Sequence, residues 1–222
     1  MSEHGTLTVS GDVAVSTILD QPPDAVASLV LAHGAGAGMR HHFMERLAGA
    51  VAERGLAVFR YQFPYLEAGR RRVDPPALVE QTVRAAVAAA RQALPELPVF
   101  AGGKSFGGRM SSRAAAAPPG LDVRGLVFFG FPLHPPGRPA TERAAHLPGV
   151  RVPMLFLQGT RDDLADLDLI RGVTASLPLA TLHVVDAANH GFEVLKRSGR
   201  TNEEVMQELA DTAAGWIRER LP

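Results

Sequence analysis

The 222-residue chain carries 23 lysines and arginines against 23 aspartates and glutamates, and its net charge of zero disfavours nucleic acid and anionic membrane surfaces as partners. The absence of cysteine excludes disulfides, thiolate nucleophiles and cysteine metal sites. The length suits a single domain over residues 1–222. The N-terminal residues lack the basic and apolar blocks of an export signal, and no apolar run could span a bilayer, so we expect a cytoplasmic protein.

The first third of the chain alternates apolar runs with a helical pattern. Residues 7–9 and 13–18 predict an antiparallel hairpin, because the Ser-Gly-Asp sequence between them favours a turn. Residues 27–32 are continuously apolar, as in a strand covered on both faces, and residues 56–61 predict another buried strand. An apolar stripe that starts at His42 predicts a helix, which Gly55 ends.

The rest of the chain continues this alternation. Asp74, followed by two prolines, predicts the start of a long helix that ends at Pro95. Four more strands are expected at residues 99–101, 125–129, 154–158 and 181–185, with helices at 111–117 and 164–177. A final helix opens with the capping-box pair Thr201 and Glu204. The pattern predicts an α/β fold: a mostly parallel eight-stranded sheet with an N-terminal antiparallel hairpin and helices on both faces, whose ligands gather at the carboxyl ends of the strands.

The stretch from Pro98 to Met110 has the pattern of a strand, a sharp turn and a helix. Gly103, Ser105 and Gly107 form GxSxG, the spacing in which a serine occupies the tip of a strained turn because its neighbours carry no Cβ. The helix that follows points backbone N–H groups toward negative charge that develops nearby. A plain glycine-rich connection is the alternative, because GxSxG alone is common by chance. The choice depends on whether a base and an acid can reach Ser105.

Two later strand ends supply groups that would activate a serine. Asp162 follows the strand that ends at residue 158, and His190 lies in a short turn after the strand that ends near residue 185. Neighbouring Asp163 is better placed to cap the following helix. Alone, Asp162 would more often be a turn or cap residue, and His190 a surface histidine. The order Ser105, Asp162, His190, with each residue at a strand end, predicts a catalytic triad.

The oxyanion that forms when a serine attacks a carbonyl needs N–H donors. The residue after the nucleophile supplies one of them, which is Phe106 here. The second is expected from the loop after an earlier strand, where residues 33–36 read His-Gly-Ala-Gly. We predict that Ala35 N–H is this donor, because Gly34 and Gly36 free the backbone to turn the amide inward, and that Gly34 contacts substrate. A plain glycine-rich turn is again the alternative.

Four motifs together resemble the α/β-hydrolase superfamily over essentially the whole chain: HGAGAG at 33–38, GKSFGG at 103–108, GTRDD at 159–163 and NHGF at 189–192. The resemblance implies an α/β-hydrolase fold and a Ser-His-Asp hydrolase without metal or organic cofactor. The GKSxGGR form of the elbow, FPYLEAGRRR at 63–72 and PLHPPG at 132–137 more narrowly resemble the dienelactone-hydrolase-like group that includes testis-expressed protein 30. True dienelactone hydrolases have a cysteine nucleophile, so their substrate is not carried over.

Two functions are open at this point. The first is a serine hydrolase that cleaves small or exposed esters or thioesters. Lipase-like relatives carry a helical lid where this chain has a short, proline-rich segment at 131–150, which predicts an open, shallow site with little or no lid. The second is a catalytically silent domain that binds a small ligand or a protein partner, although nothing in the sequence indicates a protein partner. Retention of Ser105, Asp162 and His190 favours the hydrolase.

Further residues follow strands and therefore flank the predicted site. Tyr65 and His134 are predicted to contact substrate. The run Arg70, Arg71 and Arg72 is interpreted as a solvated charge cluster, with recognition of an acidic substrate group by arginine as the alternative.

Nucleotide and metal sites are disfavoured. GGKS is not the end of a P-loop, because the first glycine of that motif would stand where Pro98 does. Met39 occupies the place of the third glycine in a dinucleotide-binding GxGxxG. His41 and His42 lack the spaced third ligand that a metal site needs. No cofactor is expected.

Overall fold

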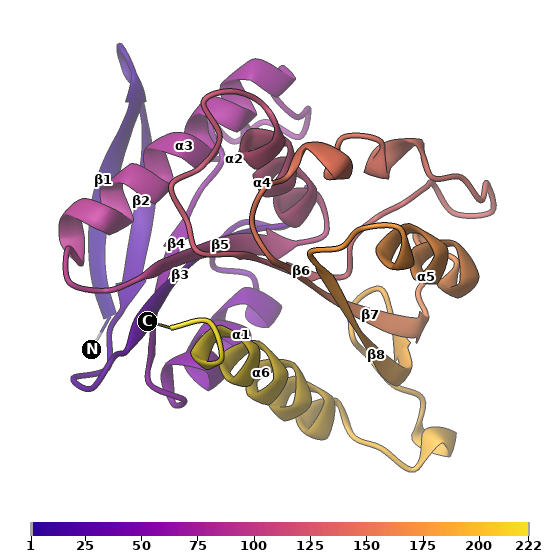
Figure 1. Cartoon of the computed structure of the whole chain (residues 1–222). Helices are drawn as coiled ribbons and strands as arrows, with labels where there is room; N and C mark the ends of the chain where they lie inside the picture. The colour runs from indigo at the N-terminus through magenta and orange to yellow at the C-terminus, as the bar shows by residue number, and fades with distance from the viewer. Residues whose placement is uncertain (1, 222) are drawn as a thin grey trace.

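The computed structural model describes residues 2–221, and its eight strands form one sheet in the order β1-β2-β4-β3-β5-β6-β7-β8 (Figure 1). β1 pairs antiparallel with β2, and β2 antiparallel with β4, whereas the other pairings are parallel. The predicted mostly parallel sheet with an N-terminal hairpin is therefore confirmed. The strands are β1 (Ser2–Ser10), β2 (Val13–Asp20), β3 (Ala27–Ala32), β4 (Leu56–Tyr61), β5 (Val99–Lys104), β6 (Leu126–Phe129), β7 (Met154–Arg161) and β8 (Ala180–Asn189).

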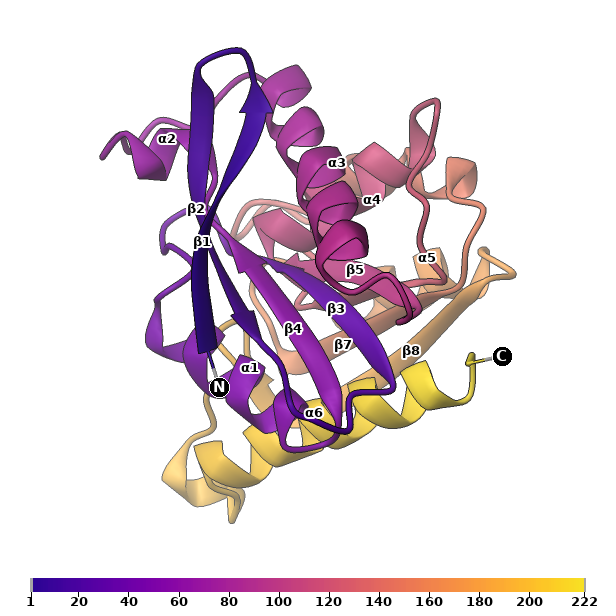
Figure 2. The ribbon, with the colours of Figure 1, turned by 90° about the vertical axis from the view of Figure 1, so that its left-hand side faces the viewer.

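Helices cover both faces of the sheet. Figure 2 looks onto the β1 edge and shows α3 and α4 on one side and α1 and α6 on the other. Each side buries its own apolar cluster against the strands. The helices are α1 (His42–Ala52), α2 (Pro64–Glu67), α3 (Pro76–Ala93), α4 (Phe106–Ala116), α5 (Leu167–Ala175) and α6 (Asn202–Arg218), with short 3-10 helices η1 (Glu142–Ala144), η2 (Leu147–Gly149) and η3 (Lys196–Ser198).

Several elements run further than their apolar runs predicted. β5 continues through the glycines to Lys104, because its backbone stays paired with β6 as far as Phe129. α4 begins at Phe106, directly after the nucleophile, and not at residue 111. β8 extends to Asn189, which pairs with Arg161 of β7. Backbone pairing carries these strands up to the predicted site residues and so limits their freedom.

The capping residues predicted at the starts of three helices can be compared with those in the structure. The Thr201 and Glu204 capping box of α6 is confirmed. Asp74 lies two residues before α3, which begins at the second proline without a side-chain cap. α5 is capped by Asp166, whose carboxylate accepts two backbone N–H bonds, and not by Asp163. Asp162 and Asp163 thus precede the cap by several residues.

The sheet order explains where a site can form. The strand order reverses direction at β3, which lies between β4 and β5. The loops after β3 and β5 therefore open next to each other at the carboxyl edge, where parallel sheets bind ligands. Between β6 and β7, residues 130–153 contain two short 3-10 helices and no α-helix. The predicted minimal lid fits this connection.

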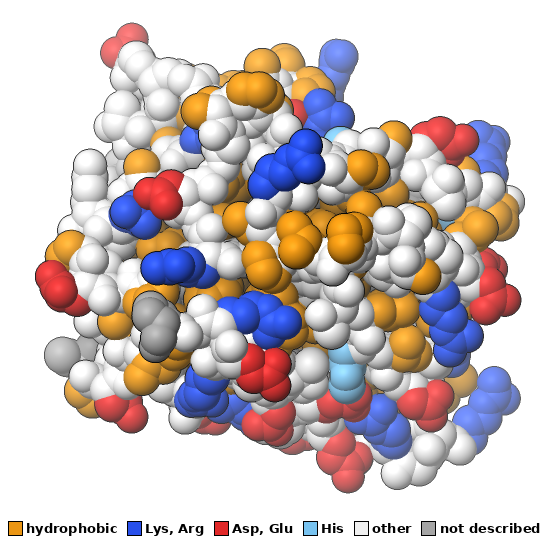
Figure 3. All heavy atoms as spheres, in the orientation of Figure 1, with side chains coloured by type: hydrophobic (Ala, Val, Ile, Leu, Met, Phe, Trp, Pro, Cys, Tyr) orange, Lys and Arg blue, Asp and Glu red, His pale blue; other side chains and the backbone are white. Residues whose placement is uncertain are grey.

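The surface agrees with the balanced composition. Basic and acidic side chains are interspersed on the face shown in Figure 3. Within residues 2–221, no helix has both the length and the apolar character needed to cross a membrane.

Candidate active site

Ser105 lies at the turn between β5 and α4 with φ 50° and ψ −116°. A non-glycine residue in such a conformation costs on the order of 1–3 kcal/mol and persists only when its surroundings hold it. Its amide donates to the carbonyl oxygen of Phe129 at 3.0 Å, and its own carbonyl accepts from the amide of Arg109 at 3.1 Å. These bonds fix the strained turn between the sheet and the first turn of α4.

The glycines on either side of Ser105 permit close backbone contact. A Cβ on Gly103 would lie 2.3 Å from the carbonyl oxygen of Ala32, and one on Gly107 would lie 2.5 Å from that of His33. Neither distance allows a side chain. The elbow therefore packs directly against the end of β3, as the GxSxG pattern predicts.

Three predicted residues form one hydrogen-bonded chain. His190 Nε2 lies 2.8 Å from Ser105 Oγ, and His190 Nδ1 lies 2.7 Å from Asp162 Oδ2. The Asp162 side chain is fully buried, whereas that of His190 keeps 20% of its surface exposed. The carboxylate accepts the Nδ1–H bond, which leaves Nε2 as the acceptor for the serine hydroxyl. The geometry is that of a serine activated by a base whose tautomer is set by an acid.

Gln158 orients the acid and was not found by sequence reasoning. Its Nε2 donates to Asp162 Oδ2 at 2.5 Å, while its Oε1 accepts from the amide of Phe131 at 2.9 Å. The other carboxylate oxygen, Oδ1, accepts from the amide of Leu164 at 2.8 Å. A fully buried glutamine within an apolar strand is the sequence signal that could have indicated this role.

His33 is buried at the end of β3 and is held neutral. Its Nε2 accepts from the amide of Phe63 at 3.0 Å, and its Nδ1–H donates to the carbonyl oxygen of Gly34 at 2.7 Å. Burial lowers the pKa of His33 to about 4, although the bond to Gly34 acts in the opposite direction. The neutral imidazole thereby links the loop after β3 to the segment after β4.

The bond from His33 to the Gly34 carbonyl helps to orient the Ala35 amide, which is one of the predicted oxyanion donors. In a trans peptide the C=O and N–H groups point in opposite directions, so the bond that holds the Gly34 carbonyl also sets the direction of the Ala35 N–H. The Tyr65 hydroxyl holds the next carbonyl, that of Ala35, at 2.8 Å. Phe106 is the first residue of α4, where an N–H has no intrahelical acceptor. Both amides come from segments that meet at Ser105.

A cavity of about 420 Å³ lies over these groups, with Gly34, Ala35, Lys104, Ser105 and His190 in its wall. Its other walls come from the start of α1 and the turn after β8. Gly34 therefore shares the wall of this cavity with Ser105, and its contact with substrate stays a prediction.

Tyr65 and His134 do not line this cavity, contrary to the prediction. α2 turns Tyr65 into the interior, where burial first and the Asp74 carboxylate second raise its pKa to about 12. His134 is buried, and its Nε2 accepts from the amide of Asp166 at 2.8 Å. Both side chains hold backbone in place and do not face substrate.

The arginine run also lies outside the cavity. Arg70 pairs with Asp74 at 2.7 Å, and the side chains of Arg71 and Arg72 are exposed. Arg70 and Arg72 border a separate hollow with residues 73–76. These positions fit the solvated cluster better than recognition of a substrate at Ser105.

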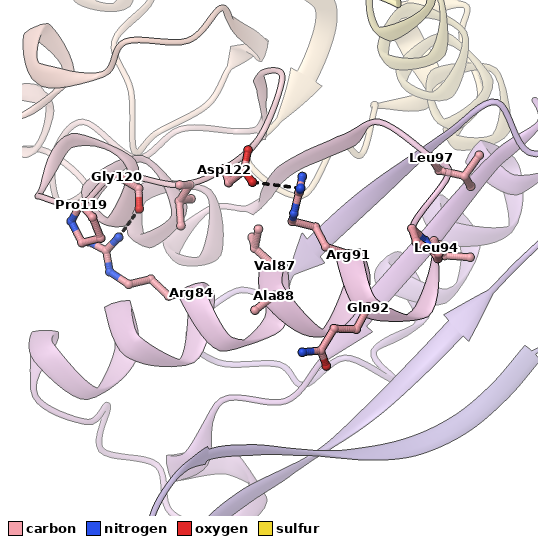
Figure 4. A pocket seen from close by; sticks show the side chains of 12 residues that line it. Arg84, Val87, Ala88, Arg91, Gln92, Leu94, Leu97, Pro119, Gly120 and Asp122 are labelled. Atoms are coloured by element: carbon pink, nitrogen blue, oxygen red, sulfur yellow. Dashed lines mark hydrogen bonds and ion pairs between the residues drawn. The ribbon is translucent and has the colours of Figure 1, made fainter.

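A larger cavity of about 610 Å³ lies between α3 and residues 119–122 (Figure 4). Its cations are already engaged: Arg84 donates to the carbonyl oxygens of Ala117 and Gly120, and Arg91 pairs with Asp122 at 3.0 Å. No predicted site residue lines it. The smaller cavity therefore holds the reactive groups.

Residues 2–221 contain no cluster of three or more histidine, aspartate or glutamate side chains that could hold a metal ion.

The model of the alpha/beta hydrolase domain family matches residues 25–218. The chain belongs to this family. The α/β-hydrolase is also similar to the crystal structure of dienelactone hydrolase from Anabaena variabilis, with 22% identity, TM-score 0.78 and coverage of 100% of this chain and 99% of that one. Its likeness to a serine hydrolase from Xanthomonas campestris, described as lacking a lid, has 23% identity, TM-score 0.74 and coverage of 97% and 94%.

A third likeness is to the esterase domain of a Rhodothermus marinus protein, with 18% identity, TM-score 0.73 and full coverage of both chains. At these identities the structures show the shared fold. The predicted membership of the α/β-hydrolases is confirmed by the family model, whereas the narrower dienelactone-hydrolase-like group that includes testis-expressed protein 30 stays a prediction.

The neutral state of His33 makes the α/β-hydrolase sensitive to acid. Its pKa is about 4 in the folded protein against an ordinary value of 6.5, so the unfolded chain binds the proton more readily. This contribution to stability is complete above pH 6.5 and is lost as the pH falls toward 4. Between pH 7 and about pH 4.5, His33→Asn should lose roughly 2 kcal/mol less unfolding free energy than the native protein.

Urea unfolding at the two pH values measures this difference. His42→Asn, which replaces an exposed histidine, is the matched control and should keep the native pH dependence. An unchanged pH dependence in His33→Asn would contradict the buried neutral imidazole.

Proposed function

We propose that this α/β-hydrolase is a serine hydrolase that cleaves small or exposed carboxylic esters or thioesters through an acyl-enzyme on Ser105. The observation that carries the proposal is the hydrogen-bonded chain from Ser105 Oγ through His190 to Asp162, with distances of 2.8 and 2.7 Å. The hydroxyl lies beside the cavity and on a turn whose backbone amides can meet a developing oxyanion.

Acylation begins when Ser105 Oγ attacks the acyl carbon. The hydroxyl proton passes to His190 Nε2 as the new C–O bond forms, and Asp162 stabilises the resulting imidazolium through Nδ1–H. The Ala35 and Phe106 amides donate to the oxyanion. The tetrahedral intermediate then collapses, and His190 gives the proton to the departing alkoxide or thiolate.

Deacylation reverses these roles with water as the nucleophile. His190 removes a proton from water as the oxygen attacks the acyl carbon, and returns that proton to Ser105 as the acyl group leaves as a carboxylic acid. The side chains and amides already named perform every proton transfer and charge stabilisation in this cycle. A metal or organic cofactor is not required.

The size and openness of the site support small substrates. The cavity measures about 420 Å³, and the connection between β6 and β7, residues 130–153, contains no α-helix that could cover a long acyl chain. The likeness to a lidless serine hydrolase and to an esterase domain supports the same class.

A fluorophosphonate probe tests the nucleophile. Native protein is expected to be labelled, and Ser105→Ala is expected to lose all labelling, because an activated serine attacks the phosphorus of the probe, expels fluoride and becomes phosphonylated. Ser176→Ala replaces an exposed serine at the C-cap of α5, outside the cavity; this control variant should label like the native protein. A folded native protein that stays unlabelled would contradict the proposal and favour a silent binding domain.

Substitution of the neighbouring aspartates tests the acid. Asp162→Asn should lower kcat on p-nitrophenyl acetate by roughly 10³–10⁴-fold, because an amide disfavours the tautomer in which Nε2 can accept the serine proton. Asp163→Asn changes an exposed side chain and should leave kcat close to native. Steady-state kinetics at pH 7 measures both. Equal losses of kcat in the two variants would contradict the assignment of Asp162 as the acid.

Acyl-chain preference tests the substrate class. Acetyl and butyryl p-nitrophenyl esters are expected to have a kcat/KM at least roughly tenfold above that of the palmitoyl ester, because the uncovered cavity buries few methylenes. Measurements below the concentration at which the long ester forms micelles give the comparison. Faster turnover of the palmitoyl ester would overturn the preference for small substrates.

A further inference from the structure

Lys104 directly precedes the nucleophile, and the proposed reaction does not use it. Its Nζ donates to the backbone carbonyl oxygen of His190 at 2.5 Å. The side chain is half-buried in the wall of the cavity. The chain has one other lysine, Lys196, which is exposed in η3. A half-buried ammonium that bonds the backbone of the predicted base requires an explanation of its own.

Two aromatic rings lie beside the ammonium. Nζ lies 5.7 Å from the ring centroid of Phe43 and 5.3 Å from that of Phe192. The two rings stack with centroids 5.9 Å apart and an interplanar angle of 15°. Phe43 belongs to α1 and Phe192 to the turn that carries His190, so the cation connects three segments that are distant in sequence.

Gly130 provides the space for this contact. A Cβ at this position would lie 3.1 Å from Lys104 Nζ and 3.4 Å from both Cε1 and Nδ1 of His190. The backbone of Gly130 has φ 72°, a left-handed conformation that favours glycine. The ammonium and the edge of the imidazole therefore lie together over a residue without a side chain.

The charge of Lys104 persists at neutral pH. Burial lowers its pKa to about 8, while the Asp162 carboxylate acts in the opposite direction. The group is then mostly protonated at pH 7, and its bond to the His190 carbonyl is charge-assisted. Such bonds are shorter and stronger than those between neutral groups.

We propose that Lys104 is a positioning residue that ties the His190 turn to the residue before the nucleophile and so holds His190 Nε2 at hydrogen-bond distance from Ser105 Oγ. The catalytic consequence rests on the proposed hydrolase function. The tether itself rests on the contacts of Nζ alone. His190 follows the last residue of β8, in a turn whose own hydrogen bonds join Asn189 to Phe192 and Glu193. The Lys104 bond adds a link from this turn to the residue before the nucleophile.

The tether can be measured in the native protein because the chain has two lysines. Lysine labelled with the heavy nitrogen isotope gives side-chain signals for Lys104 and Lys196 in an NMR spectrum, assigned with Lys196→Met. The Nζ protons of Lys104 should exchange slowly with water near neutral pH, whereas those of Lys196 should exchange too fast to be seen. Equally fast exchange at both lysines would overturn the tether.

Lys104→Met keeps the length of the side chain and removes the donor. We expect kcat on p-nitrophenyl acetate to fall roughly 10- to 100-fold, because a small displacement of the base is costly, with KM within about threefold of native. The downfield proton signal of His190 Nδ1–H should broaden as the turn loosens. Lys196→Met is the matched control and should keep native kcat and the native signal.

Each outcome bears on one claim. A native protein without turnover contradicts the hydrolase proposal, while proton exchange at Lys104 and the His190 signal still test the tether. Native kcat and an unchanged His190 signal in Lys104→Met would overturn the positioning role. A rise in KM confined to esters whose acyl group carries a carboxylate, with kcat unchanged, would also overturn it and assign Lys104 to substrate recognition. If Lys104→Met does not fold, the exchange measurement on the native protein decides alone.

Discussion

Direct contact between backbones at the β5–α4 turn is the constraint on which the site depends. Gly103 and Gly107 lie so close to the carbonyl oxygens of β3 and the loop after it that no Cβ could be accommodated. This contact brings the loop after β3 beside Ser105 without any intervening side chain. It also supplies the packing that holds Ser105 at φ 50°, a conformation that an isolated turn would relax. The hydroxyl and the two candidate amide donors converge because of the backbone, and side chains then add the base and the acid.

The Asp162 carboxylate and the Gly34 peptide are each oriented by a buried polar side chain whose other bond goes to backbone. Gln158 joins Asp162 to the amide of Phe131, and His33 joins the Gly34 carbonyl to the amide of Phe63. A buried polar group that loses its partner pays a desolvation penalty, so these arrangements resist alternatives. The site is therefore built on interior structure that also contributes to the stability of the protein.

The meeting of Ser105, Asp162 and His190 was predictable because topology, and not local shape, brings these side chains together. Each member follows a strand, and the carboxyl ends of parallel strands must share one edge. Tyr65 and His134 also follow strands, yet α2 and the loop before α5 turn them into the interior, which no periodicity in the sequence records. Gln158 was missed for a related reason, since a buried strand residue acquires a role only when the next turn folds back over it. Sequence patterns thus located the edge of the sheet but not the paths of the loops around it.

The choice of lysine at position 104 follows from the same geometry. The chain uses arginine almost everywhere else, with lysine only at positions 104 and 196. A guanidinium is planar and carries five N–H donors in a fixed fork, which the space beside the two rings and over Gly130 would not satisfy. An ammonium is compact and can direct one N–H at the His190 carbonyl while its charge faces the rings. Gly130 and Lys104 are therefore two parts of one arrangement: the missing side chain of the first makes room for the charge of the second.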